Sequence, residues 1–287
     1  MKRITCLILI LAFILLAGCK TATQSGPDVP LWDRISETRE EIADGVTYIE
    51  RLYEDAAKNP YRVYILLADP DKVYLHTGTS EDAYSAIPLV KQDVKEHMQA
   101  SVANGMDVIA AVNGDFFAIS STYQPTGLCI KNGVMLNSNS RNRPYSAMTK
   151  DGKYLIGHSV TDDIDLQTLQ MAVGGSHVIV SEGQVHNVAL DDDFGTIAHP
   201  RTLAGVKKDG TIILAVIDGR QPEHSNGASL AQCASLMISL GAVDAINHDG
   251  GGSSTMILRQ DGAYNVMNSP SDGNLRKVFC SIQIIAK

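Results

Sequence analysis

A run of carboxylate, glycine and hydroxyl residues toward the C-terminus has the composition of a ligand-binding turn. The apolar segment Val243–Asn247 reads as a buried strand that leads toward this run. The run consists of Asp249, Gly250, Gly251, Gly252, Ser253 and Ser254. Glycine loses more conformational freedom on folding than any other residue, so three in succession suit a backbone that must approach another group closely or adopt a positive φ. We expect the strand to deliver the Asp249 carboxylate to a turn that contacts a ligand.

Three other loops also begin where an apolar strand is expected to end. They carry Asn113 with Asp115, Arg201 with Thr202, and Asp218 with Arg220. Polar groups at strand ends are a usual place for a site on a rigid scaffold, and arginine can bind a phosphate or a carboxylate through two parallel hydrogen bonds. We expect these residues and Asp249 to converge at one sheet edge. For Asn113, Asp115 and Asp218 an ordinary turn remains the alternative, because Asn-Gly and Asp-Gly are common turn dipeptides.

The histidines and the known catalytic motifs give weaker signals. His199, His224 and His248 lack the H-E-x-x-H spacing of a helical zinc site, and each alone is more often a packing or surface residue. His248 is of most interest because it adjoins Asp249. The chain contains no G-x-S-x-G serine elbow, and neither a P-loop nor a G-x-G-x-x-G motif follows a strand. The sequence therefore requires no cofactor, while a divalent cation near His248 stays open.

The apolar pattern indicates which elements must position these residues. Strands are expected at Val46–Tyr53, Arg62–Leu67, Val73–Leu75, Val108–Val112, Val243–Asn247 and Val278–Ile285. Hairpins are expected around Asn132-Gly133, Asp151-Gly152, Glu182-Gly183 and Asp209-Gly210, because turn residues separate apolar runs there.

Helices are expected in three places. The spacing of Leu31, Ile35 and Ile42 predicts an N-terminal helix over residues 31–44. Further helices are expected over Pro88–Asn104 and over Ser229–Leu240, with Ser229 as N-cap and Gly241 as C-cap. The whole pattern predicts an α+β fold, in which helices pack on a mixed, largely antiparallel sheet, as a single domain over residues 45–287.

The N-terminus has the features of an exported lipoprotein. Lys2 and Arg3 precede an apolar run, Leu7–Leu16, that is short for a membrane span. Leu16-Ala17-Gly18-Cys19 resembles a bacterial lipobox, which implies a signal peptide at residues 1–18 and a lipid on Cys19. Residues 19–30 are then a polar tether, and the protein is lipid-anchored in the bacterial cell envelope, outside the cytoplasm. A plain secretory signal or a short anchor is the alternative.

Charge and cysteine content exclude several classes of partner and site. The formal net charge of −8 becomes −10 without residues 1–18, because they carry two positive and no negative residues (−8 − 2 = −10). An acidic body argues against nucleic acid as a general partner. Beyond Cys6 and Cys19, the chain has Cys129, Cys233 and Cys280, and no C-x-x-C. A zinc cluster is not indicated, while one disulfide plus a free thiol, or three thiols, both stay open.

Several segments together resemble the phosphodiester glycosidase family. They are VNGDFF (112–117), GLCIKNG (127–133), RTLAGVKKDG (201–210), VIDGR (216–220), LAQCASLMISLGAVDA (230–245) and NHDGGGSSTM (247–256). The resemblance spans about residues 45–287 in the expected order, and the DGGGSS block is its most specific part. One departure is His248, since the family more often has an apolar residue there. The resemblance implies that residues 45–287 form a catalytic domain that cleaves the C1–O bond of a sugar-1-phosphodiester.

The resemblance also implies roles for the residues at the strand ends. An oxocarbenium-like centre is stabilised by a nearby carboxylate, which gives catalytic roles to Asp249, Asp218 and Asp115. A phosphate is bound by guanidinium groups and backbone N–H groups. The residues expected to bind substrate or its phosphate are Arg201, Arg220, Asn113, Thr202, Gly250, Gly251, Ser253 and Ser254.

The implied function is that of a cell-envelope glycosidase. Its substrate would be a sugar-1-phosphodiester, similar to an N-acetylglucosamine-1-phosphodiester, in a glycan or wall polymer. Two alternatives stay open at this point. One is a non-catalytic lipoprotein that binds an anionic glycan in the same cleft, and the other is a metal-dependent phosphodiesterase that breaks the P–O bond.

Overall fold

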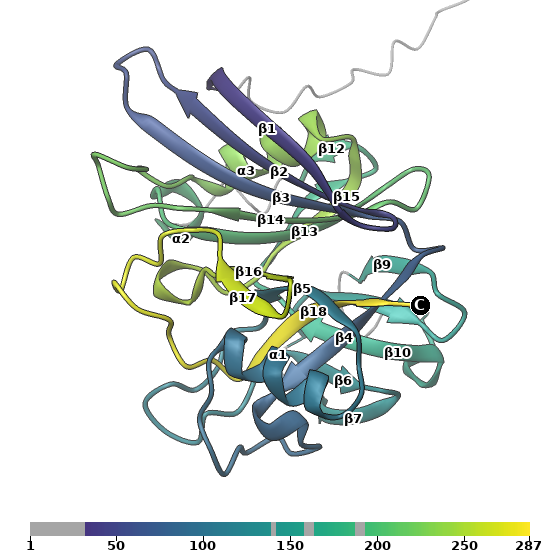
Figure 1. Ribbon diagram of the computed structural model, residues 1–287. Helices are drawn as coiled ribbons and strands as arrows, with labels where there is room; N and C mark the ends of the chain where they lie inside the picture. The colour runs from purple at the N-terminus through teal and green to yellow at the C-terminus, as the bar shows by residue number, and fades with distance from the viewer. Residues whose placement is uncertain (1–31, 139–141, 158–163, 187–192) are drawn as a thin grey trace, which may run out of the picture.

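Three antiparallel β-sheets form the framework of the protein (Figure 1). The structure is a computed structural model that describes residues 32–138, 142–157, 164–186 and 193–287. The expected signal peptide, the Cys19 anchor and the tether lie outside the described residues. Among the described helices, none is long and apolar enough to cross a membrane.

The largest sheet has eight strands in the order β1-β2-β3-β14-β13-β15-β11-β12. Its strands are β1 (Asp33–Ala43), β2 (Val46–Glu54), β3 (Pro60–Ala68), β14 (Ile212–Ile217), β13 (Arg201–Lys207), β15 (Ala242–Asn247), β11 (His177–Ser181) and β12 (Gln184–Val185). All of its neighbouring strands run antiparallel.

Two five-stranded sheets complete the framework, in the orders β17-β16-β5-β18-β4 and β7-β6-β10-β8-β9. The first consists of β17 (Ala263–Val266), β16 (Met256–Gln260), β5 (Val108–Asn113), β18 (Cys280–Ala286) and β4 (Val73–Thr79). The second consists of β7 (Val134–Ser138), β6 (Leu128–Lys131), β10 (Leu169–Gly174), β8 (Tyr145–Thr149) and β9 (Tyr154–Gly157).

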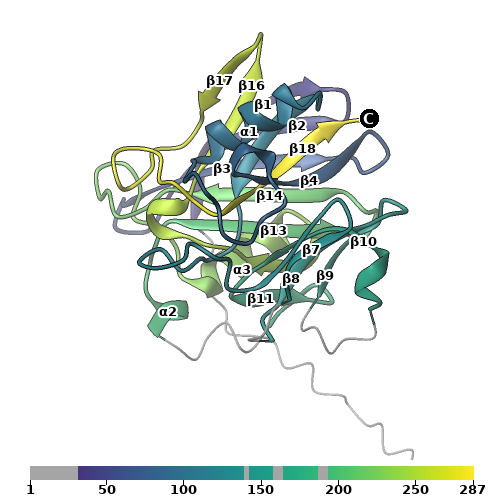
Figure 2. The ribbon, with the colours of Figure 1, turned by 90° about the horizontal axis from the view of Figure 1, so that it is seen from below.

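Helices are few, so the predicted α+β class is wrong. The described residues contain three α-helices, α1 (Val94–Ala103), α2 (Asp193–Thr196) and α3 (Leu230–Ser239), and short 3-10 turns at Ser80–Asp82, Leu166–Thr168 and Gly251–Ser253. The two ten-residue helices, α1 and α3, lie on opposite sides of the molecule (Figures 1 and 2). The protein is a mostly β structure, because the first expected helix is replaced by a strand and the helices that do form are short beside the three sheets.

The main core lies where the three sheets face one another. It combines side chains from every sheet, including Leu66, Val112, Val173 and Ile284. Smaller cores fill the space between the large sheet and α3 and between the β5-containing sheet and α1. β14 shows how one strand serves two cores, because successive side chains point to opposite faces of a sheet. Leu214 belongs to the main core and Ile213 to the core beneath α3.

The predicted N-terminal helix over residues 31–44 is wrong, since Asp33–Ala43 forms strand β1. β1 pairs with β2 from Asp33↔Glu54 to Ala43↔Val46, and the two strands are joined by the two-residue turn Asp44-Gly45. Nearly all of β1 is exposed, so it has no apolar face that could set a strand period. The pairing with β2 therefore decides its conformation, and a short turn of this kind is a hairpin signal.

The other elements agree more closely with the sequence. All six expected strands are confirmed, as are the hairpins at Asn132-Gly133, Asp151-Gly152, Glu182-Gly183 and Asp209-Gly210. α3 begins after Ser229, which forms a capping box with Gln232. The helix expected from Pro88 begins only at Val94, because Asp93 and Glu96 form a capping box there.

Candidate active site

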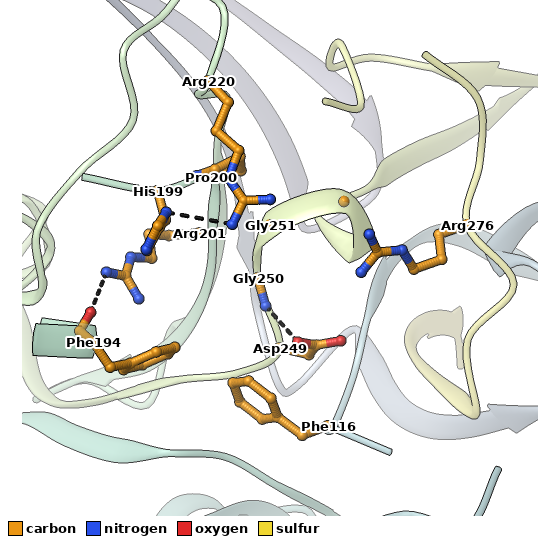
Figure 3. A pocket seen from close by; sticks show the side chains of 11 residues that line it. Phe116, Phe194, His199, Pro200, Arg201, Arg220, Asp249, Gly250, Gly251 and Arg276 are labelled. Carbon is orange, nitrogen blue, oxygen red and sulfur yellow. Dashed lines mark hydrogen bonds between the residues drawn. The ribbon is translucent and has the colours of Figure 1, made fainter. Parts of the chain in front are cut away.

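A pocket of about 200 Å³ opens where the ends of several strands meet (Figure 3). Its lining residues are Phe116, Phe194, His199, Pro200, Arg201, Arg220, Asp249, Gly250, Gly251, Gly252 and Arg276. Phe116 follows β5, Arg201 begins β13, Arg220 follows β14, and Asp249 follows β15. Two different sheets supply these strands, so the expectation that one sheet edge carries all the site residues is wrong.

Asn113 joins the two sheets behind the pocket. Its Nδ2 donates to the carbonyl oxygen of Asp249 at 2.7 Å, although the two residues are 136 positions apart. Its Oδ1 accepts from the Thr202 hydroxyl at 2.7 Å and from the Thr255 N–H at 3.0 Å. Asn113 and Thr202 are buried and do not line the pocket. They fix the position of the Asp249 turn, because Thr202 hydrogen-bonds the Asn113 side chain and Asn113 hydrogen-bonds the backbone of the turn.

The glycines of the turn are needed for close approach. Gly251 has φ +60°, and a Cβ there would lie 3.0 Å from Nη1 of Arg220. A Cβ on Gly252 would overlap Arg276 and Asp272. Side chains at these positions would push both arginines away from the turn, so the glycines let guanidinium groups rest against the backbone.

The Asp249 carboxyl lies at the centre of the pocket and is half-buried. Its Oδ1 accepts the Gly250 N–H at 2.9 Å, and its own N–H donates to the Gly114 carbonyl at 3.0 Å. Burial raises its pKa to about 6, while hydrogen bonds from Ser253 and Gly250 and the charges of Arg276 and Arg143 oppose the rise. Near neutral pH the carboxyl is therefore largely ionised but gains a proton easily.

Asp115 supplies a second carboxyl directly behind the first. It is buried and accepts the Gly127 N–H at 2.6 Å, and its other oxygen lies 3.8 Å from Nη1 of Arg143. Burial raises its pKa to about 7; Arg143 opposes the rise and the charge of Asp249 adds to it. Asp115 does not line the pocket, so it reaches the reaction through its charge.

Two arginines border the turn from opposite sides (Figure 3). Arg220 is exposed, and its Nη2 donates to Nδ1 of His199 at 3.4 Å. Within the described residues no carboxylate forms an ion pair with Arg220. Arg276 pairs with Asp272 at 2.7 Å, and its Nη1 donates to the Ser253 hydroxyl at 3.4 Å. Both guanidinium groups can meet an anion that rests on the glycine turn.

Arg201 is held by the pocket wall. Its guanidinium is buried and donates to the carbonyl oxygens of Ala228 at 2.9 Å, Phe194 at 2.7 Å and Ile197 at 2.9 Å. It also lies over the Phe194 ring, 4.7 Å from its centroid. Phe194 in turn meets Phe116 edge to face at 6.0 Å. Arg201 thus fixes an aromatic side of the pocket, because it ties α2 to the start of β13.

Asp218 lies outside the pocket, although it is close in sequence to Arg220. One carboxylate oxygen accepts from Tyr64 at 3.1 Å, His224 at 2.8 Å and the Ser269 N–H at 2.9 Å. The other accepts from Asn268 at 3.0 Å. With four donors from three segments, the buried carboxylate ties together the loops that follow β14 and β17.

His248 is also used for packing beneath the turn. Its Nδ1 donates to the Gly174 carbonyl at 2.7 Å, so its Nε2 accepts from the Ser146 hydroxyl at 3.1 Å. Burial lowers its pKa to about 4, which keeps the ring neutral. Ser253 and Ser254, farther along the same turn, are also buried. The Ser254 hydroxyl has no hydrogen-bond partner within the described residues.

The structure therefore brings Asp249, Arg201, Arg220, Gly250 and Gly251 together in one pocket. Asn113, Thr202 and Asp115 lie behind its wall, Ser253 and Ser254 lie under the turn, and Asp218 is farther away. Phe194, Arg276 and Arg143 were not expected from the sequence. They lie in α2 or in loops without a strand pattern, so no periodicity marked them.

No group of three or more His, Cys, Asp and Glu side chains suited to a metal ion occurs in the part of the chain that the structure describes. The three cysteines there, Cys129, Cys233 and Cys280, are buried free thiols. The Cys280 sulfur accepts the N–H of Asp115 at 3.4 Å.

Comparison with known families gives one match over most of the domain. The profile of a family described as phosphodiester glycosidase matches residues 106–284. An uncharacterized SPbeta prophage-derived protein of Bacillus subtilis, YomE, is 36% identical over 88 residues, which are 31% of this chain and 13% of that protein. The chain thus matches only a small part of that curated relative.

Comparison with solved structures identifies the fold. The catalytic domain of zebrafish N-acetylglucosamine-1-phosphodiester alpha-N-acetylglucosaminidase, auto-inhibited by its pro-peptide, superimposes with a TM-score of 0.67 at 18% identity, covering 92% of this chain and 86% of that one. A putative exported protein from Burkholderia pseudomallei gives a TM-score of 0.63 at 15% identity, covering 90% of this chain and 98% of that one. A hypothetical protein from Synechocystis gives 0.66 at 13% identity, covering 91% and 64%.

Proposed function

We propose, since the chain belongs to the phosphodiester glycosidase family, that it hydrolyses the bond between the anomeric carbon and the phosphate oxygen of a sugar-1-phosphodiester. The single observation that carries this proposal is the division of the pocket. Phe116 and Phe194 form one side, Arg220 and Arg276 border the other, and the Asp249 carboxyl lies between them (Figure 3).

The two sides suit the two halves of such a substrate. Aromatic rings offer an apolar surface with a defined geometry, which suits the C–H face of a sugar ring. Guanidinium groups bind phosphate through charge-assisted hydrogen bonds. A sugar that rests on Phe116 and Phe194, with its phosphate beside Arg220 and Arg276, has its anomeric carbon close to Asp249. This is where positive charge develops when the C1–O bond breaks.

The leaving group explains why one carboxylate at the pocket centre is sufficient. A phosphate monoester is a stable anion, so its departure needs little protonation. The electron pair of the C1–O bond moves to the phosphate oxygen, and a water molecule adds to C1 and releases one proton to the solvent, which leaves the hydroxyl group at C1. The ionised Asp249 carboxylate stabilises the positive anomeric centre, and the arginines stabilise the departing phosphate.

We further propose that the protein acts in the bacterial cell envelope, as a lipid-anchored enzyme. The support is the lipobox-like sequence Leu16-Ala17-Gly18-Cys19 after a short apolar run. Its substrate would then be a glycan or wall polymer that carries sugar-1-phosphodiester links. An N-acetylglucosamine-1-phosphodiester is the first compound to test, given the activity in the name of the zebrafish protein.

Analysis of products tests the reaction. With an N-acetylglucosamine-1-phosphodiester we expect free reducing sugar and a phosphomonoester, with and without a chelator. Sugar phosphate plus free alcohol, lost on chelation, would instead indicate a metal-dependent phosphodiesterase. No turnover on a panel of such diesters would indicate a binding protein. The same assay on intact cells, with a charged substrate that cannot enter, tests the location.

Arg220→Lys should weaken the proposed contact to phosphate. An ammonium group cannot replace a planar guanidinium that makes two parallel hydrogen bonds, and a hydrogen bond to a charged group contributes about 1.5–3 kcal/mol. We expect kcat/KM to fall by about ten- to a hundredfold. Arg39→Lys, on the exposed strand β1, is the matched control and should have no effect. If both substitutions have an equally small effect on kcat/KM, Arg220 does not bind the phosphate.

A further inference from the structure

The pocket has room for only part of a sugar phosphodiester. Its volume of about 200 Å³ lies below the roughly 300–1,000 Å³ of pockets that bury a drug-sized ligand. A sugar and one phosphate therefore occupy it, and the group on the far side of the phosphate must continue over the protein surface. This group can leave the pocket either past Arg276 or past Arg220, the two arginines that border the phosphate side.

On the Arg276 side the surface is positively charged. Lys277 is exposed next to it in the chain, and the Tyr123 hydroxyl donates to the carbonyl of Lys277 at 2.6 Å. The Nζ of the exposed Lys91 lies over the Tyr123 ring, 4.2 Å from its centroid. We call Lys91, Tyr123 and Lys277 the lysine patch.

The lysine patch is held in place. Tyr123 is buried with φ +67°, its N–H donates to the Ala118 carbonyl at 3.0 Å, and its ring packs on Phe117 at 4.6 Å. Gln92 and Val278 form a bridge beside the two lysines. The backbone under both lysines is therefore fixed relative to Arg276.

Neither lysine of the patch is engaged in an ion pair within the described ranges, although Lys277 interacts with the charge of Asp93. Burial raises the pKa of Asp93, and the charge of Lys277 opposes that rise. The Asp93 side chain already accepts the Glu96 N–H as the N-cap of α1. In a chain of net charge −8, two unpaired lysines beside the pocket arginines form a local positive field. On the Arg220 side, by contrast, the next charged residue is the exposed acid Glu223.

We propose that the lysine patch binds a second phosphate of the substrate, on the group that leaves the pocket past Arg276. This rests on the proposed function and names its substrate class: a chain of repeating sugar and phosphate units, or a sugar-1-phosphodiester whose leaving group carries a further phosphate. The patch raises the affinity for the leaving group, and the bond that breaks remains the C1–O bond in the pocket.

A pair of matched substrates tests the patch. Both contain N-acetylglucosamine-1-phosphoglycerol, and one carries an additional phosphate on the far glycerol hydroxyl. The wild-type protein should prefer the bisphosphate, through a lower KM. Lys91→Glu with Lys277→Glu should lower the ratio of the two kcat/KM values by about tenfold at low salt, and the wild-type preference should fall at high salt.

The control variant is Lys150→Glu with Lys208→Glu, which changes the net charge by the same amount. Both lysines are exposed outside the pocket, and Lys208 follows the end of β13 opposite to Arg201. This variant should keep the wild-type ratio. An unchanged ratio in the patch variant, or an equal fall in both variants, would overturn the proposal. Lys91→Gln with Lys277→Gln replaces the patch variant if the glutamates prevent folding.

Binding separates failure of this proposal from failure of the proposed function. If the wild-type protein cleaves neither substrate, the proposed function fails, and calorimetry with inorganic tripolyphosphate still tests the patch. The patch variant should then bind at least several-fold more weakly than the control variant. Equal binding by the two variants would overturn the lysine patch.

Discussion

Asp249→Asn is expected to lower kcat on a sugar-1-phosphodiester by several powers of ten, as is common when a central catalytic group is lost. The amide has the shape of the carboxyl and can still accept the Gly250 N–H, which now donates at 2.9 Å. It lacks the negative charge that stabilises the anomeric centre. The fall should therefore appear in kcat rather than in folding, measured by steady-state kinetics and by thermal unfolding.

The control for this substitution is Asp261→Asn, in the turn between β16 and β17. It removes the same charge outside the pocket and should keep full activity. If Asp249→Asn retains near wild-type turnover, the glycine turn only shapes the pocket and the proposed mechanism fails. If Asp249→Asn unfolds the protein, Asp249→Glu provides the second test. This variant keeps the negative charge and should retain more activity than the amide variant.

Much of the strand framework could be predicted because buried strands leave a clear pattern. β5 and β14 are almost entirely apolar, since they are buried on both faces. The hairpins were marked by turn dipeptides with glycine. Asp249 and its glycines could be singled out because three glycines beside an acid at a strand end have few other uses.

The errors have physical causes in particular residues. β1 is an edge strand whose Ile35 is exposed, while Ile42 is half-buried against the main core, so their helical spacing did not mark one buried face. Arg276 reaches the pocket from a loop and Phe194 from the short helix α2, and the positions of both depend on tertiary contacts, with Asp272 and Arg201 respectively. Asp218 precedes a glycine after an apolar strand, as a catalytic residue could, yet four donors occupy its carboxylate. Sequence indicates that an acid is present, but not which groups surround it.

The two raised carboxyl pKa values predict a narrow pH optimum for kcat/KM, between about 6 and about 7. Below about 6, Asp249 gains a proton and loses the charge that stabilises the anomeric centre. Above about 7, Asp115 loses its proton and places a second negative charge behind the pocket that binds the phosphodiester anion. Since the two groups interact, the observed values belong to the pair.

Asp115→Asn separates the two limbs. At pH 6 the Asp115 carboxyl is already largely neutral, so the variant should keep the acid limb and lose the alkaline one. A pKa raised by burial means that Asp115 contributes stability below its unfolded value of 3.8, which is lost as the pH rises through about 7. The variant should therefore be more stable than the wild type in urea at pH 8, with a smaller difference at pH 5. An alkaline limb that persists in Asp115→Asn would assign that limb to another group and leave Asp115 as a packing residue. A shifted acid limb would instead show that Asp115 carries its charge at pH 6. The contacts with Gly127 and Arg143 would then stabilise the charged carboxylate by more than burial destabilises it.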